Sequence, residues 1–350
     1  MKVNFILPHF GVKPTGGFKI VYQYANYLSE RGYYVNIIHT SSASEEKNKY
    51  FRYVKSYVRL KLEKNKWFEF NRDIKLLFVP DLSERYIPDA DVTIATAWQT
   101  AKYLNRYTSS KGKRVYLIQG YEIWNGDKKE VEETWKYDMK KIVISKWLLD
   151  ISNELRASQV VHIPNGLDHN KFKVIDDIDN RGFIISMMYS DIESKGAKDG
   201  LTALNNLKEE YPELKVKLFG KCKAPYNLPE WIEYYKNPEQ KFLVENIYNK
   251  SSIFLSTSWS EGWGLPPMEA MACGCAVVST DSGGVRDFII DNKTALMCEP
   301  KNITQIYECM LKLVKDDDFR IELAKSGNKY IKKFNWDRSF SKFEEIITEA

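Results

Sequence analysis

The chain has 350 residues, 43% of them hydrophobic, and a formal net charge of +5. This length exceeds what one hydrophobic core usually serves, so we expect two globular domains. The charge excess is small and no nucleic-acid-binding motif accompanies it, so no nucleic-acid partner is expected. The five cysteines are odd in number and include no C-x-x-C pair, so neither a disulfide framework nor a zinc site is expected.

No segment has the apolar length of a signal peptide or of a membrane-spanning helix, so we expect a cytoplasmic protein. The first half of the chain alternates apolar runs with amphipathic segments. It begins with a predicted strand, a loop, a helix and a second strand, at 2–7, 8–17, 18–30 and 34–39. Further apolar runs predict strands, at 74–80, 90–98, 113–120, 140–147 and 160–166.

The second half of the chain repeats this alternation. It predicts a strand, a helix, a strand, a helix and a strand, at 182–190, 201–212, 214–220, 238–250 and 252–256. Strands that alternate with helices favour an α/β fold, with a doubly wound parallel sheet in each half. The segment 168–181 has no core pattern and contains four aspartates, so we expect an interdomain linker there.

The most informative stretch is 252–284, in which Glu261 and Glu269 stand eight positions apart around the turn GWG at 262–264. Two prolines after the turn suit the first turn of a helix, where N–H groups have no intrahelical partner. Free N–H groups and the positive end of a helix dipole favour an anion such as phosphate. The alternative is that both glutamates only complement the helix dipole.

The E-x7-E spacing, with GWGLPPM inside it, resembles the motif of the retaining family 4 glycosyltransferases. The resemblance implies that Glu269 binds the ribose of a donor nucleotide and that Glu261 contacts the transferred sugar near its anomeric centre. It also implies that the backbone of Gly262, Gly264 and Leu265 borders the donor.

The resemblance covers most of the chain and implies the GT-B architecture, two Rossmann-like doubly wound domains that face a central cleft. By this comparison, 1–168 is the acceptor-side domain and 169–335 binds the nucleotide sugar. Residues 336–350 resemble the closing helix that returns to the N-terminal domain. A donor in the cleft agrees with the rule that ligands of open α/β sheets bind beyond the carboxyl ends of the strands.

Three further residues match the family's phosphate site. Gly16 and Gly17 lie between the first strand and the first helix, where backbone N–H groups can approach phosphates. A tight turn without ligand is the alternative for these glycines. Lys195 matches a lysine that neutralises the leaving pyrophosphate, whereas a lysine outside such a motif is usually a solvated surface residue.

The sequence departs from the family pattern at two places. The arginine expected ahead of the lysine is absent, and Met188, Tyr189 or Ser190 takes its place. The histidine expected beside the transferred sugar is replaced by Gln119, whose amide can donate to a hydroxyl but cannot titrate near neutrality. Tyr121 and Glu122 are secondary candidates for contacts with donor or acceptor.

The resemblance implies a retaining, metal-independent hexosyltransferase with no cofactor, in which the leaving phosphate takes the acceptor proton on the same face of the sugar. No D-x-D pair follows an early strand, and the four histidines are scattered. The expected donor is linked to dTDP, UDP or GDP, with dTDP-rhamnose indicated by the two departures. The expected acceptor is a bacterial surface glycan or a lipid-linked glycan. A catalytically idle paralogue that binds a nucleotide sugar is the alternative.

Two other interpretations remain. Gly262 and Gly264 form half of a G-x-G-x-x-G pattern, and Asp281 lies where a dinucleotide fold places its ribose-binding acid, so an NAD(P)-dependent dehydrogenase is a second enzyme class. At 47–78, Lys and Arg alternate with Tyr, Phe and Trp, which predicts contact with anionic lipid at the inner face of the plasma membrane. A β-hairpin with a charged outer face is the alternative there.

Overall fold

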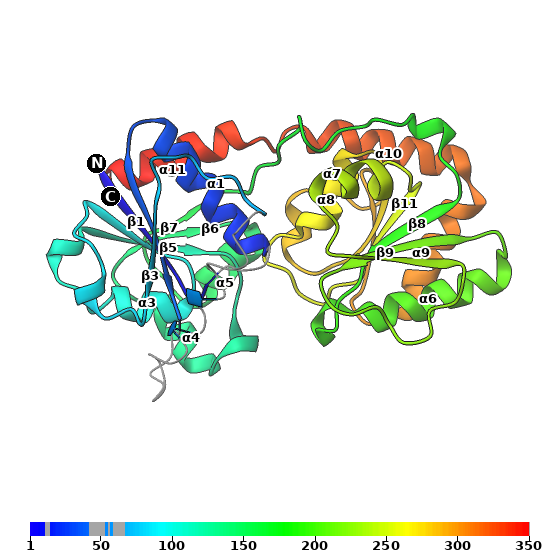
Figure 1. Ribbon diagram of the computed structural model, residues 1–350. Helices are drawn as coiled ribbons and strands as arrows, with labels where there is room; N and C mark the ends of the chain where they lie inside the picture. The colour runs from blue at the N-terminus through cyan, green and yellow to red at the C-terminus, as the bar shows by residue number, and fades with distance from the viewer. Residues whose placement is uncertain (11–14, 42–52, 55–56, 59–66, 350) are drawn as a thin grey trace. The chain divides into compact units, whose positions relative to one another are not determined.

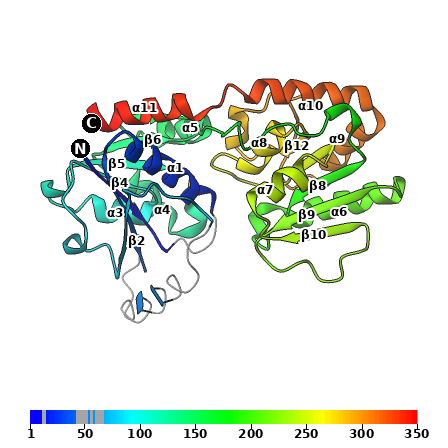
Figure 2. The same ribbon diagram turned by 45° about the horizontal axis from the view of Figure 1, so that its top comes forward.

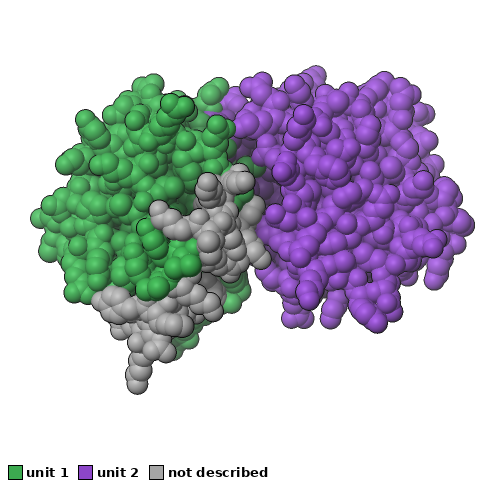
Figure 3. Space-filling view, viewed as in Figure 1, with its two compact units in different colours: residues 1–165, 337–350 green, residues 166–336 purple. Residues whose placement is uncertain are grey.

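The computed structural model describes residues 1–10, 15–41, 53–54, 57–58 and 67–349 (Figure 1). These residues divide into two compact units (Figure 3). The first unit consists of 1–165 together with 337–350, and the second of 166–336. Each unit is a parallel sheet with helices packed on it, so the predicted α/β class with two Rossmann-like domains is confirmed.

The sheet of the first unit has seven strands in the order β3-β2-β1-β4-β5-β6-β7, and every neighbouring pair is parallel. The strand order reverses direction between β1 and β4, the kind of point at which open α/β sheets bind ligands. The strands are β1 (Lys2–Leu7), β2 (Tyr34–Thr40), β3 (Lys75–Val79), β4 (Val92–Ala95), β5 (Lys113–Ile118), β6 (Lys140–Val143) and β7 (Val160–His162).

The helices of the first unit include one from the end of the chain. They are α1 (Gly16–Glu30), α3 (Trp98–Leu104), α4 (Lys128–Thr134), α5 (Lys146–Glu154) and α11 (Trp336–Glu349). Helix α11 lies alongside α1 (Figure 1, Figure 2). Phe343 of α11 stacks on Tyr24 of α1 with ring centroids 4.1 Å apart, and Glu344 accepts hydrogen bonds from Tyr27 and Tyr33. The predicted return of the C-terminal helix is confirmed.

The sheet of the second unit has six parallel strands in the order β10-β9-β8-β11-β12-β13. Its strand order reverses between β8 and β11. The strands are β8 (Ile184–Met188), β9 (Lys215–Gly220), β10 (Ile232–Lys236), β11 (Ile253–Ser256), β12 (Ala276–Thr280) and β13 (Leu296–Cys298). The two edge strands, β10 and β13, are absent from the sequence prediction.

The helices of the second unit are α6 (Ala197–Glu210), α7 (Gln240–Phe242), α8 (Leu265–Ala272), α9 (Ile303–Lys315) and α10 (Asp317–Ile331). Helix α7 continues directly into a π-helix at Leu243–Tyr248. A π-helix widens the backbone by one residue per turn and often occurs at functional sites. The single helix predicted at 238–250 is thus two short pieces with different hydrogen-bond patterns.

The segment 168–181, which we expected to link the domains, belongs to the second unit. Phe172 is buried there, and the Asn249 side chain accepts from the Ile175 N–H at 2.7 Å and donates to the Lys173 carbonyl at 3.1 Å. The polar composition of this segment does not predict these contacts, because the segment makes them mostly through its backbone.

Candidate functional site

Two of the predicted catalytic residues meet at the carboxyl edge of the second sheet. Lys195 ends the 3₁₀ turn Glu193–Lys195 after β8, and Glu261 lies in the loop after β11. The Nζ of Lys195 donates to Oε1 of Glu261 at 2.6 Å. Their side chains are 25% and 18% exposed, so this ion pair is largely withdrawn from water. The strand order, in which β8 neighbours β11, brings these distant residues together.

The position of Lys195 is set by the backbone around it. Gly196 has φ of +60°, and a Cβ there would lie 2.0 Å from the carbonyl oxygen of Thr257. The Thr257 hydroxyl donates to the Lys195 carbonyl at 3.2 Å, and the Trp259 N–H donates to the Ser194 carbonyl at 2.8 Å. A side chain at Gly196 is excluded both by space and by its left-handed backbone. The loops after β8 and β11 are therefore held together, and the backbone position of Lys195 is fixed.

Glu261 is anchored by the loop that follows β12. Its N–H donates to the Ser282 carbonyl at 2.8 Å, and its carbonyl accepts from the Gly284 N–H at 3.1 Å. Gly284 packs so closely that a Cβ would lie 2.4 Å from the Gly262 carbonyl oxygen. The start of the E-x7-E motif, from Glu261 into the GWG turn, is thus held against the loop that follows β12.

The helix of the motif is α8, and Gly264 precedes it with φ of +97°. Pro266 and Pro267 occupy its first turn, as the sequence predicts. Because proline has no N–H, the first three positions of α8 leave Leu265 as their one backbone donor. The start of this helix therefore offers an anion fewer backbone donors than a usual helix start does.

Glu269 lies one turn into α8 and is 8% exposed. Its Oε2 accepts a hydrogen bond at 3.2 Å from the hydroxyl of Tyr248, the last residue of the π-helix. Burial, reinforced by the Glu269 carboxylate, raises the pKa of Tyr248 well above its ordinary value, so the phenol stays a donor. Nothing in the sequence pattern distinguishes Tyr248 from an ordinary core tyrosine.

Tyr189 and Ser190 follow β8, where the family pattern has an arginine. The Tyr189 ring packs edge-on against Tyr234, with centroids 6.0 Å apart, and the Ser190 hydroxyl accepts from the Ile192 N–H at 3.2 Å. Both side chains make contacts within the second unit, and neither supplies a positive charge. The structure does not compensate for the missing arginine at this position.

Asp281, the acid of the dehydrogenase interpretation, follows β12. Its two oxygens accept from Nε and Nη2 of Arg286 at 2.7 and 2.8 Å. A carboxylate held by both oxygens on a guanidinium is poorly placed to receive two ribose hydroxyls. This geometry disfavours a nicotinamide site.

In the first unit, Gly16 and Gly17 are the first two residues of α1, two positions earlier than the predicted helix start. A Cβ on Gly17 would lie 3.5 Å from the amide of Gln119, which follows β5, so the structure brings these two predicted residues together. Oε1 of Gln119 is buried and has no hydrogen-bond partner among the described residues. Residues 11–14 of the predicted phosphate loop lie outside the described residues.

Glu122 lies close to Gln119 in the chain. Its Oε2 accepts from the Trp98 N–H at 2.8 Å, at the start of α3. Burial raises the pKa of Glu122 to about 7, against the lowering effect of that hydrogen bond. Tyr121 donates its hydroxyl to Glu132. Tyr121 is therefore engaged within the unit, whereas one oxygen of Glu122 takes part in no hydrogen bond with the described residues.

Half of the basic aromatic stretch at 47–78 lies outside the described residues. Three of its described aromatic rings, those of Trp67, Phe68 and Phe70, pack around Tyr22 of α1, with centroids 5.4, 5.1 and 4.7 Å away. Its end belongs to β3, which pairs in parallel with β2. These contacts place the described rings within the unit, and membrane contact stays a prediction.

None of the helices among the described residues is both long and apolar enough to span a membrane. Within the same residues, no three or more His, Cys, Asp or Glu side chains are grouped so that they could hold a metal ion.

Solved structures with similar folds cover the whole chain. HepE from Anabaena in complex with UDP-glucose has a TM-score of 0.77 at 14% identity, with 100% of both chains covered. The sucrose-phosphate synthase of Thermosynechococcus elongatus has a TM-score of 0.76 at 15% identity, with 99% of this chain and 98% of that one covered. At these identities the similarity shows the fold alone.

Curated relatives match parts of the chain. An uncharacterized glycosyltransferase of Methanocaldococcus jannaschii, MJ1178, is 24% identical over 60% of this chain and 59% of its own length. The poly(glycerol-phosphate) alpha-glucosyltransferase of Bacillus subtilis is 26% identical over 48% of this chain and 27% of its own. The capsular polysaccharide biosynthesis glycosyltransferase CapM of Staphylococcus aureus is 20% identical over 53% of this chain and 51% of its own.

The chain thus spans less than two thirds of these relatives' length. The family model described as glycosyl transferases group 1 matches residues 168–333, which is nearly all of the second unit. That segment contains Lys195, Glu261 and Glu269. Residues 168–333 thus match the model of the glycosyl transferases group 1, within a chain that has the GT-B fold.

Proposed function

We propose that this protein is a retaining, metal-independent glycosyltransferase that moves a sugar from a nucleoside diphosphate sugar to an acceptor hydroxyl. The observation that carries the proposal is the Lys195–Glu261 pair, at 2.6 Å, in the matched group 1 domain. It combines a cation suited to a diphosphate with a carboxylate suited to sugar hydroxyls. Both side chains start from backbone positions that the neighbouring loops hold.

Each group of the second unit has a distinct task in this proposal. Lys195 and the Leu265 N–H bind the diphosphate, and Lys195 stabilises the charge that grows on it as the glycosidic bond breaks. Glu269 accepts hydrogen bonds from the ribose hydroxyls, while its bond from Tyr248 fixes the orientation of the carboxylate. Glu261 leaves Lys195 to the diphosphate and turns to the hydroxyls of the transferred sugar.

The transfer itself needs no basic side chain. The bond between the anomeric carbon and the phosphate oxygen breaks, and the acceptor oxygen bonds to the same face of that carbon. The acceptor proton moves to the leaving phosphate oxygen, which becomes more basic as it departs. Gln119, being neutral, contributes a hydrogen bond and no proton transfer. The first unit, with Gly16, Gly17 and Gln119, is proposed to hold the acceptor.

The names of similar proteins support the substrate class. HepE was solved with UDP-glucose, the B. subtilis relative is named for poly(glycerol-phosphate), and CapM for capsular polysaccharide. We propose a UDP-, dTDP- or GDP-linked donor, with dTDP-rhamnose as the first to try, and a cell-surface glycan or lipid-linked glycan as acceptor.

A panel of UDP, dTDP and GDP in a thermal-shift assay tests the proposal directly. A ligand that binds the folded state raises the melting temperature by mass action, so one nucleotide should stabilise the protein more than the others and more than inorganic phosphate. No stabilisation by any of them at millimolar concentration would contradict a nucleotide-sugar site.

The second candidate function is a catalytically idle protein that binds a nucleotide sugar. The observation that favours it is the uncompensated loss of the phosphate-site arginine, where Tyr189 and Ser190 lie. The two candidates differ in one measurable property, because an active enzyme hydrolyses its donor slowly without acceptor. Nucleotide release from the bound donor, followed over hours, separates them.

A further inference from the structure

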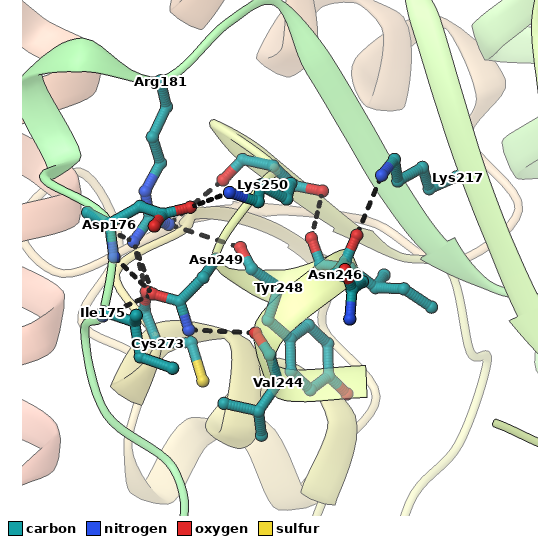
Figure 4. A network of polar contacts seen from close by, with 12 residues as sticks. Ile175, Asp176, Arg181, Lys217, Val244, Asn246, Tyr248, Asn249, Lys250 and Cys273 are labelled. Atoms are coloured by element: carbon teal, nitrogen blue, oxygen red, sulfur yellow. Dashed lines mark hydrogen bonds and ion pairs between the residues drawn. The ribbon is translucent and has the colours of Figure 1, made fainter. Parts of the chain in front are cut away.

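A buried arginine, Arg181, lies just before β8 and is 8% exposed. Its two terminal nitrogens donate only to neutral oxygens (Figure 4). The acceptors are the carbonyls of Tyr248 at 3.3 Å, Ser251 at 3.2 Å, Asp176 at 3.0 Å and Cys273 at 2.6 Å, and the side-chain oxygen of Asn249 at 3.1 Å. No carboxylate of the described residues pairs with this cation.

A buried charge without a counter-ion is costly unless dipoles replace its water. Here two of the five acceptors lie at helix ends. Tyr248 is the last residue of the π-helix, and Cys273 caps the C-terminus of α8. The carboxyl end of a helix carries a partial negative charge, so Arg181 lies where two such ends converge. The carboxylate of Asp176 is instead paired with Lys250 at 2.8 Å.

The two helices that Arg181 joins carry the proposed ribose contact. Tyr248 donates its hydroxyl to Glu269 at 3.2 Å, and the Cys273 N–H donates to the Glu269 carbonyl at 3.0 Å. The carbonyl of Cys273 that Arg181 binds is therefore one helical turn from Glu269. Any shift of α8 along its axis would move both Glu269 and its bond to Tyr248.

Asn249 closes the same network on the π-helix. Its Nδ2 donates to the Val244 carbonyl at 3.0 Å, while its Oδ1 accepts from Arg181 and from the Ile175 N–H. The end of the π-helix is thus fixed from two directions. A π-helix is rare and mostly occurs as a single turn, so contacts at its end help to keep it in place.

We propose that Arg181 is a positioning residue for nucleoside recognition: it joins the carboxyl ends of α8 and the π-helix and so holds Glu269 and Tyr248 in the geometry that binds a ribose. This inference rests on the proposed function, because the ribose contact of Glu269 is part of it. A purely structural role for Arg181 would lower stability and leave the affinity of the folded protein unchanged.

The test compares Arg181→Met with Arg320→Met. Arg320 is a matched control, since it is also 8% exposed and lies in the second unit, on α10, with Asp317 as its partner. The probe is whichever of UDP, dTDP and GDP binds the parent most tightly, with inorganic pyrophosphate as a second probe that has no ribose. Affinities are measured by calorimetry well below each variant's melting temperature.

Arg181→Met should weaken nucleotide binding by about tenfold or more, because misplaced recognition groups lose most of their contribution. Binding of pyrophosphate should stay within about twofold, since its main contact, Lys195, lies after β8 and outside the two helices that Arg181 joins. In a Glu269→Ala background, Arg181→Met should cost no more than a further twofold, because it acts through Glu269. Arg320→Met should lower the melting temperature without changing either affinity.

Arg181→Lys covers the case in which Arg181→Met does not fold. It keeps the charge but loses the planar fork of donors, so it should bind the nucleotide with intermediate affinity. A folded Arg181→Met or Arg181→Lys protein that binds the nucleotide like the parent would overturn the positioning role. A parent that binds none of the three nucleotides would instead overturn the proposed function.

Discussion

Exchange of Glu261 for glutamine should strengthen nucleotide binding while it weakens sugar transfer. Without a donor, Glu261 neutralises Lys195 across 2.6 Å, with side chains 18% and 25% exposed. An incoming diphosphate must compete with this internal carboxylate for the ammonium group. Glu261→Gln keeps the shape of the side chain and removes its charge, so it leaves Lys195 available to the diphosphate.

The expected gain follows from the energy of the pair. Two unit charges about 4 Å apart attract by about 4 kcal/mol at an effective dielectric constant of about 20. Desolvation offsets most of this, and partly exposed pairs retain on the order of 1 kcal/mol, which corresponds to about fivefold in affinity. Transfer should fall by about tenfold or more, because the amide is a poorer acceptor for hydroxyls of the transferred sugar.

Calorimetric titration with the cognate nucleoside diphosphate, at low and at high salt, checks the binding part. The gain should shrink as salt rises, because salt screens partly exposed charges. Asp281→Asn is a matched control, since Asp281 also pairs with a cation, Arg286, and both lie in the loop after β12. This exchange should change the affinity by less than twofold. If the affinity falls in Glu261→Gln, Lys195 does not leave Glu261 to bind the diphosphate. If transfer stays at the parental rate, Glu261 does not bind the transferred sugar.

Four further predictions concern the site and the first unit. Lys195→Ala should lower turnover on the order of 100- to 1000-fold. Steady-state rates within about threefold of the parent would show that Lys195 does not stabilise the leaving diphosphate. Glu269→Ala should weaken nucleotide binding by about 1 to 3 kcal/mol in a calorimetric titration, and unchanged affinity would remove it from the ribose site. Turnover should persist in excess EDTA, whereas loss that only magnesium or manganese restores would contradict metal independence. Because the pKa of Glu122 is raised to about 7, the folded state holds its proton longer than the unfolded chain, so stability should fall as pH rises from about 4.5 to 7. Glu122→Gln should remove that decline and raise the free energy of unfolding at pH 8 by about 1 to 3 kcal/mol, as measured by urea titration at several pH values.

The central strands of both sheets were predictable because they are buried on both faces and so read as continuous apolar runs. The predicted strand at 2–7 matches β1, and the predicted strands at 113–120 and 182–190 contain β5 and β8. The edge strands β10 and β13 escaped prediction because they are short or half exposed, and their apolar signal is weak. The π-helix escaped it because its sequence has the spacing of an ordinary helix.

By itself the sequence determined the α/β class, the start of α8 through its glycine and two prolines, and the local spacing of Glu261 and Glu269. These features depend on residues close together in the chain, where backbone geometry follows from residue type. Only the tertiary structure decided that Lys195 meets Glu261, that Tyr248 holds Glu269, and that Arg181 joins the ends of two helices. Each of those contacts depends on which strands are neighbours and on how deeply each loop is buried. Both properties arise from residues far apart in the chain, so local sequence does not predict them.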